Sequence, residues 1–286
     1  RRPSPADLAS MLAGLSPMAY TPSPMVVRAP TRAVAPVMGE TLDDLKAMAP
    51  KLNPVVGYYN PLGIGEPGFE DISISTLPES SRSTIAWFRQ AEIKHGRVAM
   101  AAFVGFIVGE NKIHFPWALQ GGPNPITYED IANVGGAAAQ WDAVPTLGKL
   151  QIILAVGALE IWSEAAGTHY MAPGGKPGAY PSFEPLRKEI GQPTLDLYDP
   201  FGFSKNRTPE QKERGLLVEI NNGRAAMLGI MGFVSAASVE GSVPALAGKI
   251  TPYSGEVMAP FAAGDTSLPF VAEMLNYPHF PLTSFW

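Results

Sequence analysis

The sequence contains no cysteine, which excludes disulfides, thiolate-held metals, iron–sulfur clusters and cysteine nucleophiles. Charged residues are also scarce, at 16% of the 286 residues against roughly 25% in ordinary soluble domains. The formal net charge of −5 gives no electrostatic reason to expect nucleic acid as a partner. The four histidines lie too far apart for a local metal-binding motif. Composition therefore removes several classes of metalloprotein, thiol enzyme and nucleic-acid-binding protein.

Long hydrophobic runs are missing as well. A helix that spans a membrane needs about 20 mostly apolar residues. The uninterrupted uncharged runs are shorter: Val98–Gly109, the stretch between Lys149 and Glu160, and Ala225–Val239. Hydropathy alone therefore leaves two interpretations open, a membrane protein and a soluble helical bundle.

Glycine and proline are abundant, with 29 of each, and they leave room for only a few long helices. The clearest start signal is Thr208 as a cap, with Pro209 at the first helical position and Gln211 three residues after the cap. Thr146 is expected to cap another helix, after Pro145. The three long helices are predicted at Ser83–Asn111, Leu147–Ala165 and Pro209–Val239.

The segments between these helices, Phe115–Val144 and Met171–Arg207, are expected to be loops, because they are rich in Gly and Pro. A short helix is predicted at Leu268–Asn276, with one apolar side that suits a membrane interface or packing on the protein. The predicted organisation is an N-terminal arm or targeting remnant (1–40), a three-helix domain (41–250) and a C-terminal tail (251–286). The arm holds several Arg and many Ser, Pro and Ala, which fits organelle targeting or a retained extension.

An internal repeat is the sharpest signal in the sequence. At an offset of 127 residues, Glu92–Phe106 superposes on Glu219–Phe233 with eight of fifteen positions identical. Upstream, Tyr59–Gly63 is similar to Tyr198–Gly202 at a slightly different offset. A repeated turn before a repeated helix indicates duplication and predicts a pseudo-two-fold arrangement of the first and third helices.

Each copy of the repeat places a Glu and an Arg at the entrance to an apolar run. Glu and Arg five residues apart do not share a helix face well, and ionisable groups inside a membrane are usually paired or functional. Two-fold symmetry offers a solution in which Glu92 pairs with Arg224 and Glu219 pairs with Arg97, and one carboxylate oxygen of each Glu stays free. The residues alone leave open whether these are simple salt bridges or ligand sites.

Neighbouring residues favour ligand sites. His95 lies three residues after Glu92, and Asn222 lies three residues after Glu219, so each pair shares a helix face. Carboxylate, imidazole and amide groups all offer a lone pair to a cation such as magnesium. Many small residues surround both pairs, and these let helices, or a flat macrocycle, approach the backbone closely.

The motifs Glu-Ile-Lys-His-Gly-Arg-Val-Ala-Met and Glu-Ile-Asn-Asn-Gly-Arg-Ala-Ala-Met closely resemble those of the light-harvesting chlorophyll-binding proteins. Within this family, the motifs resemble those of the chlorophyll a/c branch of algae, which comprises the fucoxanthin and peridinin antennae. The resemblance covers roughly Val55–Leu246. It implies an all-α integral membrane fold of three transmembrane helices, with the first and third as a crossed pseudo-two-fold pair, plus a short amphipathic helix.

The resemblance also implies a set of pigment ligands. The magnesium of chlorophyll would be bound by Glu92, His95, Glu219 and Asn222, while Arg97 and Arg224 close the two ion pairs. In the middle helix, Gln151 and Glu160 match positions that bind further chlorophylls. Weaker candidates are Glu164, whose alternative is a solvated charge at the helix end, and His114, which would end the first helix. The third helix departs from the family pattern, because Met231–Val239 offers only Ser235 and Ser238 where many members have Gln or His.

A non-enzymatic light-harvesting protein of the plastid (chloroplast) thylakoid membrane is therefore predicted, a multi-pass protein that passes excitation energy to a photosystem. Its expected cofactors are chlorophyll a, chlorophyll c and a carotenoid (fucoxanthin, peridinin or a related xanthophyll), with lipids. Expected partners are photosystem core subunits, neighbouring antenna proteins and thylakoid lipids, without nucleic acid. The long loops and tail favour docking at photosystem I. Two alternatives remain: a photoprotective, quenching member of the same family, and a pigment-free membrane transporter that uses the buried Glu/Arg pairs.

Overall fold

The computed structural model describes residues 42–63, 80–172, 174–190, 202–203, 206–257, 259–265 and 267–276. The predicted arm, 1–40, and most of the turn Tyr198–Gly202 lie outside these residues. The regular secondary structure of the described part is mostly helical, in agreement with the all-α prediction, and includes one small two-stranded sheet. Its elements are α2 (Leu42–Leu52), α3 (Ser80–Glu110), β1 (Ala118–Gln120), β2 (Ile126–Thr127), α4 (Tyr128–Val134), α5 (Ala137–Ala143), α6 (Thr146–Ala165), α7 (Glu184–Ile190), α8 (Pro209–Ser238), the 3₁₀ turn η2 (Pro244–Leu246) and α9 (Val271–Asn276).

The three long helices predicted from the sequence are α3, α6 and α8, and each begins and ends within three residues of the prediction. Helix α8 starts as expected: Thr208 and Gln211 form a reciprocal capping box, with Pro209 at the first position. The prediction that Thr146 caps α6 is wrong. Pro145 occupies the cap position, and the Thr146 hydroxyl donates to Asp265 instead, because a long-range carboxylate lies within its reach.

The prediction that Phe115–Val144 is a loop is wrong. The segment contains β1, β2, α4 and α5. The run of Gly and Pro at residues 121–125 forms only the connection between two antiparallel strands, with Ala118 opposite Thr127. Thr127 and Asp130 then make a capping box that starts α4. In Met171–Arg207, a short helix, α7, was likewise missed, and so was α2 before the repeat. The local capping signals of such short helices are easily masked by neighbouring breakers.

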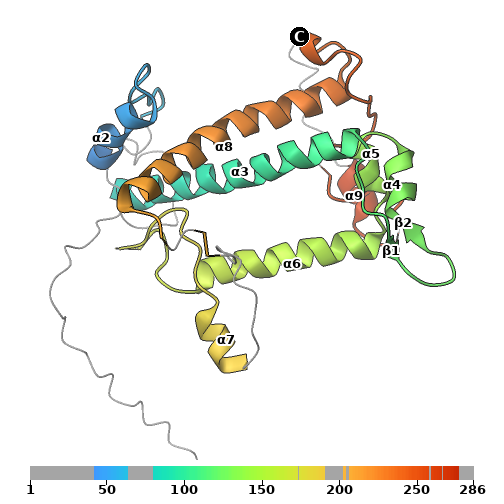
Figure 1. Cartoon of the computed structure of the whole chain (residues 1–286), viewed down its shortest axis with the longest axis horizontal. Coiled ribbons are helices and arrows are strands. Elements are labelled where there is room, and N and C mark those ends of the chain that lie inside the picture. Colours follow the sequence, from blue (N-terminus) through green and yellow to red (C-terminus); the bar gives the residue numbers. More distant parts are fainter. Residues whose placement is uncertain are drawn as a thin grey trace, which may run out of the picture. The chain divides into compact units, whose positions relative to one another are not determined.

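Helices α3 and α8 run side by side and form the most extensive contact between any two described elements (Figure 1). Both start at the same end of the pair, because residues 127 apart in the sequence occupy equivalent places. Farther along the pair, Phe233 of α8 stacks on Phe103 and Phe106 of α3, with ring centroids 4.8 and 5.2 Å apart. The repeat thus folds as the crossed pair that its symmetry predicted.

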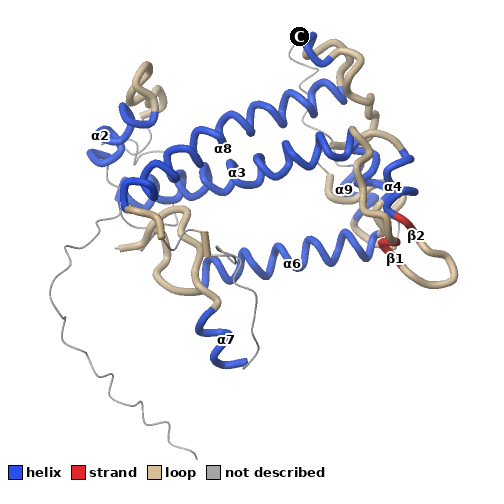
Figure 2. The backbone as a smooth tube through the Cα atoms, in the orientation of Figure 1, coloured by secondary structure: helices blue, strands red, loops and turns tan. Residues whose placement is uncertain are grey.

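Helix α6 lies apart from this pair, as Figure 2 shows. No described helix packs closely along its length, and only 11% of its apolar stretch is buried in protein. Among the described helices it is the one that is long and apolar enough to cross a membrane by length and composition. Its apolar side chains, such as Leu154 and Ile161, stay about 70% exposed to any surrounding molecule. A surface of this kind marks a site of contact with a membrane, a ligand or another protein.

The predicted short helix is present as α9, somewhat shorter than expected. Val271 is buried and Phe270 meets Phe261 edge to face, so part of the apolar side packs on the protein. Together with α4 and α5, this segment gathers at the end of the long helices where α3 finishes and α6 begins (Figure 1).

Candidate functional site

The crossing of α3 and α8 occurs at Gly96 and Gly223, the same position of the two repeat copies. A Cβ atom added to Gly223 would lie 2.9 Å from the Cα of Gly96, and the reverse substitution gives 3.1 Å. Real Cβ atoms essentially never approach closer than 3.0 Å, and 3.1 Å is tighter than nine in ten real Cβ contacts. The two backbones therefore touch: a side chain at Gly223 would force the helices apart, and one at Gly96 would require a shift of a few tenths of an ångström.

Two ion pairs flank this contact, in the reciprocal arrangement that the repeat predicted. Nε and Nη2 of Arg224 both lie 2.7 Å from Oε1 of Glu92. Nε of Arg97 lies 2.6 Å from Oε1 of Glu219. Each carboxylate on one helix is thus neutralised by a guanidinium from the other.

The two carboxylates differ in their second oxygen. Oε2 of Glu92 accepts a bond from Arg89, one turn earlier on α3, at 3.2 Å. The expectation that one oxygen stays free is therefore wrong for Glu92, although a carboxylate oxygen has a second lone pair. Within the described residues Oε2 of Glu219 has no such partner, because Leu216 stands at the position equivalent to Arg89. The duplication left one site with two cations and the other with one.

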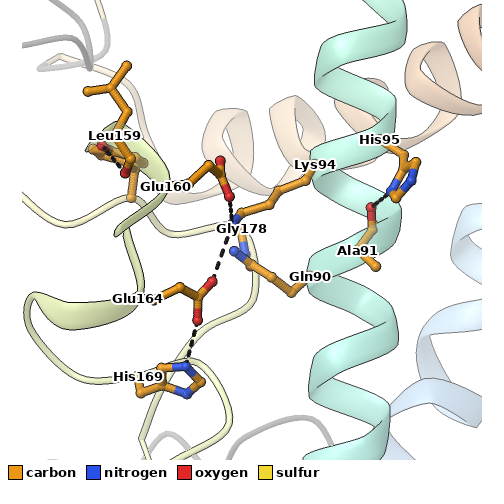
Figure 3. A network of polar contacts seen from close by, with 10 residues as sticks. Gln90, Ala91, Lys94, His95, Leu159, Glu160, Glu164, His169 and Gly178 are labelled. Carbon is orange, nitrogen blue, oxygen red and sulfur yellow. Dashed lines mark hydrogen bonds and ion pairs between the residues drawn. The ribbon is translucent and has the colours of Figure 1, made fainter. Parts of the chain in front are cut away.

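His95 is prepared to act as a ligand. Its Nδ1 lies 2.7 Å from the carbonyl oxygen of Ala91, which can only accept, so Nδ1 carries the proton (Figure 3). In neutral His95 the Nε2 atom then offers its lone pair, and the side chain is exposed. Asn222, three residues after Glu219, is also exposed. Both copies of the repeat therefore present a second donor beside the crossing.

The middle helix carries the remaining ligand candidates. Gln151 is exposed and lies in the first half of α6. Glu160 binds Lys94 of α3 through Oε2, at 2.6 Å, and shows no partner for Oε1 among the described residues. Glu164 uses both oxygens, since Oε1 meets Lys94 at 3.3 Å and Oε2 meets His169 at 2.8 Å (Figure 3). Of the two glutamates, Glu160 is the one that keeps an oxygen available.

The prediction that His114 ends the first helix is wrong. Helix α3 finishes at Glu110, and His114 lies in the following extended segment, where Nδ1 meets the carbonyl of Phe115 at 3.1 Å. In the third helix Ser235 and Ser238 occupy the stretch without Gln or His, and the carbonyl of Ser235 accepts the capping N–H of Val239. These two parts of the chain offer weaker donors than the crossing does.

A second polar cluster, at the other end of α6, was missed by sequence reasoning. Lys149 is fully buried and its Nζ lies 2.6 Å from Oδ2 of Asp265, in the tail. Asp265 also accepts from the hydroxyl of Thr146 and the backbone N–H of Ala262. Glu110 likewise ties the tail to α3, by accepting from Thr251. The available signal was a single Lys at the start of an otherwise apolar helix, which requires a buried partner.

The donor set fits a metal that arrives inside a macrocycle. The described residues contain no group of three or more His, Asp or Glu side chains that could cage a free ion. They instead present isolated single donors at separate points, each next to exposed apolar residues such as Val98 and Leu228. The magnesium of chlorophyll needs one axial donor and an apolar surface for its ring, so the residues present suit that group.

This arrangement describes a helical protein whose two longest helices cross at a charge-compensated contact and present exposed single donors. Comparison with known sequences agrees. Residues 45–238 match the family described as chlorophyll A-B binding protein. The chain belongs to this chlorophyll-binding family.

Its relatives include a fucoxanthin-chlorophyll a-c binding protein of Trieres chinensis, 31% identical over 67% of this chain and 78% of the relative. A fucoxanthin-chlorophyll a-c binding protein E of Macrocystis pyrifera is 30% identical over 62% of this chain and 68% of the relative. Light-harvesting complex stress-related protein 1 of Chlamydomonas reinhardtii is 31% identical over 73% of this chain and 76% of the relative. The resemblance to light-harvesting proteins of the algal branch is confirmed.

Proposed function

We propose that this chain is a light-harvesting protein of the chloroplast thylakoid membrane that binds chlorophylls and carotenoids. The observation that carries the proposal is the set of isolated donors on apolar helix faces around two reciprocal ion pairs. The pigments would absorb light and transfer excitation, while the protein fixes their spacing, orientation and electrostatic surroundings. The chain itself performs no catalytic step in this scheme.

In this proposal α3, α6 and α8 are three membrane spans. At 1.5 Å per residue, the 31 residues of α3 and the 30 of α8 reach about 45 Å, well beyond a hydrocarbon core of about 30 Å. Their polar first halves can therefore project from the membrane while the apolar second halves lie within it. The reciprocal ion pairs lower the cost of the charges near the boundary.

The proposed ligands are Glu92, His95, Glu219 and Asn222 at the crossing, and Gln151 and Glu160 on α6. Glu164 and His114 rank below them, because Glu164 belongs neither to the repeat nor to the matched Gln151 and Glu160 positions, and His114 lies outside the helix. Chlorophyll a, chlorophyll c and a xanthophyll are the proposed pigments, supported by the fucoxanthin-chlorophyll a-c binding relatives. We place the protein beside photosystem I and other antennae, because its long loop segments and tail provide surface for docking.

An absorption spectrum of the purified protein tests the proposal. We expect a chlorophyll band in the red and carotenoid absorption in the blue-green, with pigments that co-migrate with the protein. Excitation of the carotenoid should produce chlorophyll fluorescence, because pigments held at fixed short spacing transfer energy. A protein that folds in thylakoid membranes and carries no chlorophyll would overturn the antenna proposal and revive the pigment-free transporter.

A photoprotective role is the second candidate, and the similarity to the stress-related light-harvesting protein favours it. The chlorophyll fluorescence lifetime of the isolated protein, measured at pH 7.5 and pH 5, separates the two roles. For a plain antenna we expect the same lifetime at both pH values. A strong shortening at pH 5, reversed on return to pH 7.5, would assign the chain to the quenching role.

A further inference from the structure

Helix α6 meets α3 through one lysine near its end. Lys94, the residue before His95, reaches away from the α3–α8 crossing, and its Nζ lies between two glutamates of α6. It is 2.6 Å from Oε2 of Glu160 and 3.3 Å from Oε1 of Glu164 (Figure 3). Close packing along α6 is absent among the described helices, so this contact is a main link between the two helices at this end.

The two glutamates are engaged differently. Met171 donates its backbone N–H to Nδ1 of His169, so the imidazole proton is on Nε2 and points at Oε2 of Glu164. Tyr170 stacks on the same imidazole, with centroids 4.3 Å apart. Glu164 is therefore held from both sides and serves as a fixed anchor for Lys94. Glu160 keeps Oε1 without a partner among the described residues, and about half of its side chain is exposed.

A carboxylate that ligates the magnesium of a neutral chlorophyll leaves a net negative charge in an apolar place. Such a charge is costly unless a cation neutralises it. At the crossing, arginines of the opposite helix supply this cation for Glu92 and Glu219. Glu160 has no arginine partner in the described chain, but it has Lys94.

We propose that Lys94 is the counter-charge and positioning residue that makes Glu160 a chlorophyll ligand. Lys94 holds Oε2 and so directs Oε1 outward, while Glu164 and His169 fix the lysine itself. The inference rests on the proposed function, since it presupposes bound chlorophyll. It adds a third ion-paired ligand site that lies outside the repeat and joins the middle helix to the first.

Neutralising each charge in turn, and then both together, distinguishes this role from a purely mechanical link between the helices. Lys94→Met removes the cation, and Glu160→Gln replaces the carboxylate by a neutral amide that still offers an oxygen. We expect Lys94→Met to lose about one chlorophyll per protein, measured by pigment chromatography against protein content. Glu160→Gln should keep it, and the double variant should regain it, because a neutral ligand needs no counter-charge. The same pigment should vanish and return in the absorption difference spectrum.

Lys112→Met, at an exposed position two residues after the end of α3, is the control and should retain the full pigment content. If Lys94 only ties α6 to α3, the double variant will stay as poor in pigment as Lys94→Met, and that result overturns the inference. Full pigment content in Lys94→Met also overturns it. If Lys94→Met fails to accumulate, accumulation of the double variant supports the inference and its failure refutes it. A wild-type protein without chlorophyll would instead refute the proposed function itself.

Discussion

Gly223→Ala is expected to disrupt the crossed helix pair and with it most of the assembled protein. The new Cβ would lie 2.9 Å from the Cα of Gly96, and a backbone atom cannot move aside as a flexible side chain can. The helices must separate, which lengthens two ion pairs that now measure 2.6 and 2.7 Å. Overpacking of this kind costs about 3 kcal/mol, and weakened ion pairs add to it. Thermal denaturation and the yield of pigment-bearing protein measure the effect.

Gly215→Ala supplies the control on the same helix. Its Cβ would come no closer than 3.7 Å to the Arg207 side chain, an ordinary contact. Alanine stabilises a helix by about 0.5–1 kcal/mol relative to glycine, so this variant should be unchanged or slightly more stable. Equal stability of the Gly223→Ala and Gly215→Ala proteins would show that the backbones do not touch at the crossing.

Asp265→Ala should produce the second large loss of stability. It removes the carboxylate from a lysine whose side chain has 0% exposure, and leaves Lys149 with the carbonyl of Asp142 as its remaining acceptor. Breaking a buried pair in this way costs about 3–5 kcal/mol. Denaturation monitored by circular dichroism should show the loss, and the tail should become sensitive to proteolysis. The double variant Lys149→Met, Asp265→Ala should recover much of it, because no unpaired charge remains.

Lys188→Met is the surface counterpart. It breaks an exposed pair with Glu184, whose side chains are 75% and 63% exposed, and should change stability by less than about 1 kcal/mol. A loss of similar size in both single variants would contradict the special role of the buried pair.

The buried pair of Lys149 and Asp265 should keep its stabilising effect in mild acid. Burial by itself raises the pKa of Asp265, but the bonds from Lys149, Thr146 and Ala262 outweigh it, and the pKa is lowered. A depressed folded-state pKa stabilises the fold above the unfolded-state value, about 4, and this contribution is lost as pH falls through the folded-state value. The stability difference between wild type and Asp265→Asn should therefore be constant from pH 7 to pH 5. A steep decline within that interval would contradict this assignment.

The repeat made much of this architecture predictable. Glu92, Arg97 and their copies had few ways to be neutralised on apolar helices, and the two-fold solution specified both partners before any coordinates. The start of helix α8 was equally predictable, because Thr208, Pro209 and Gln211 form a local start signal. Where the physical cause lies within one turn or within an internal duplication, sequence reasoning reaches the structure.

The tail cluster and the Lys94 contact could not be found that way. Lys149 and Asp265 are 116 residues apart, and Lys94 and Glu160 are 66 apart, with no repeat to relate them. Lys149 stands in an otherwise apolar helix and so indicates a buried partner without identifying it, whereas Lys94 is one of several charged residues in the first half of α3 and gives no such signal. Arg89 is similar: its spacing from Glu92 suits a contact within α3, but the ion pair to Arg224 dominated the interpretation.

Arg89 also makes the two proposed ligand sites at the crossing unequal in charge. Duplicated ligand sites related by symmetry would give their pigments the same excitation energy. Glu92, however, sits between two guanidinium groups, whereas Glu219 has one and faces Leu216 at the equivalent turn. A pigment bound at Glu92, as proposed, would therefore experience a more positive local field than one bound at Glu219. In the proposed antenna, this one arginine would shift the excitation energies of the two pigments apart and so favour transfer of excitation in one direction.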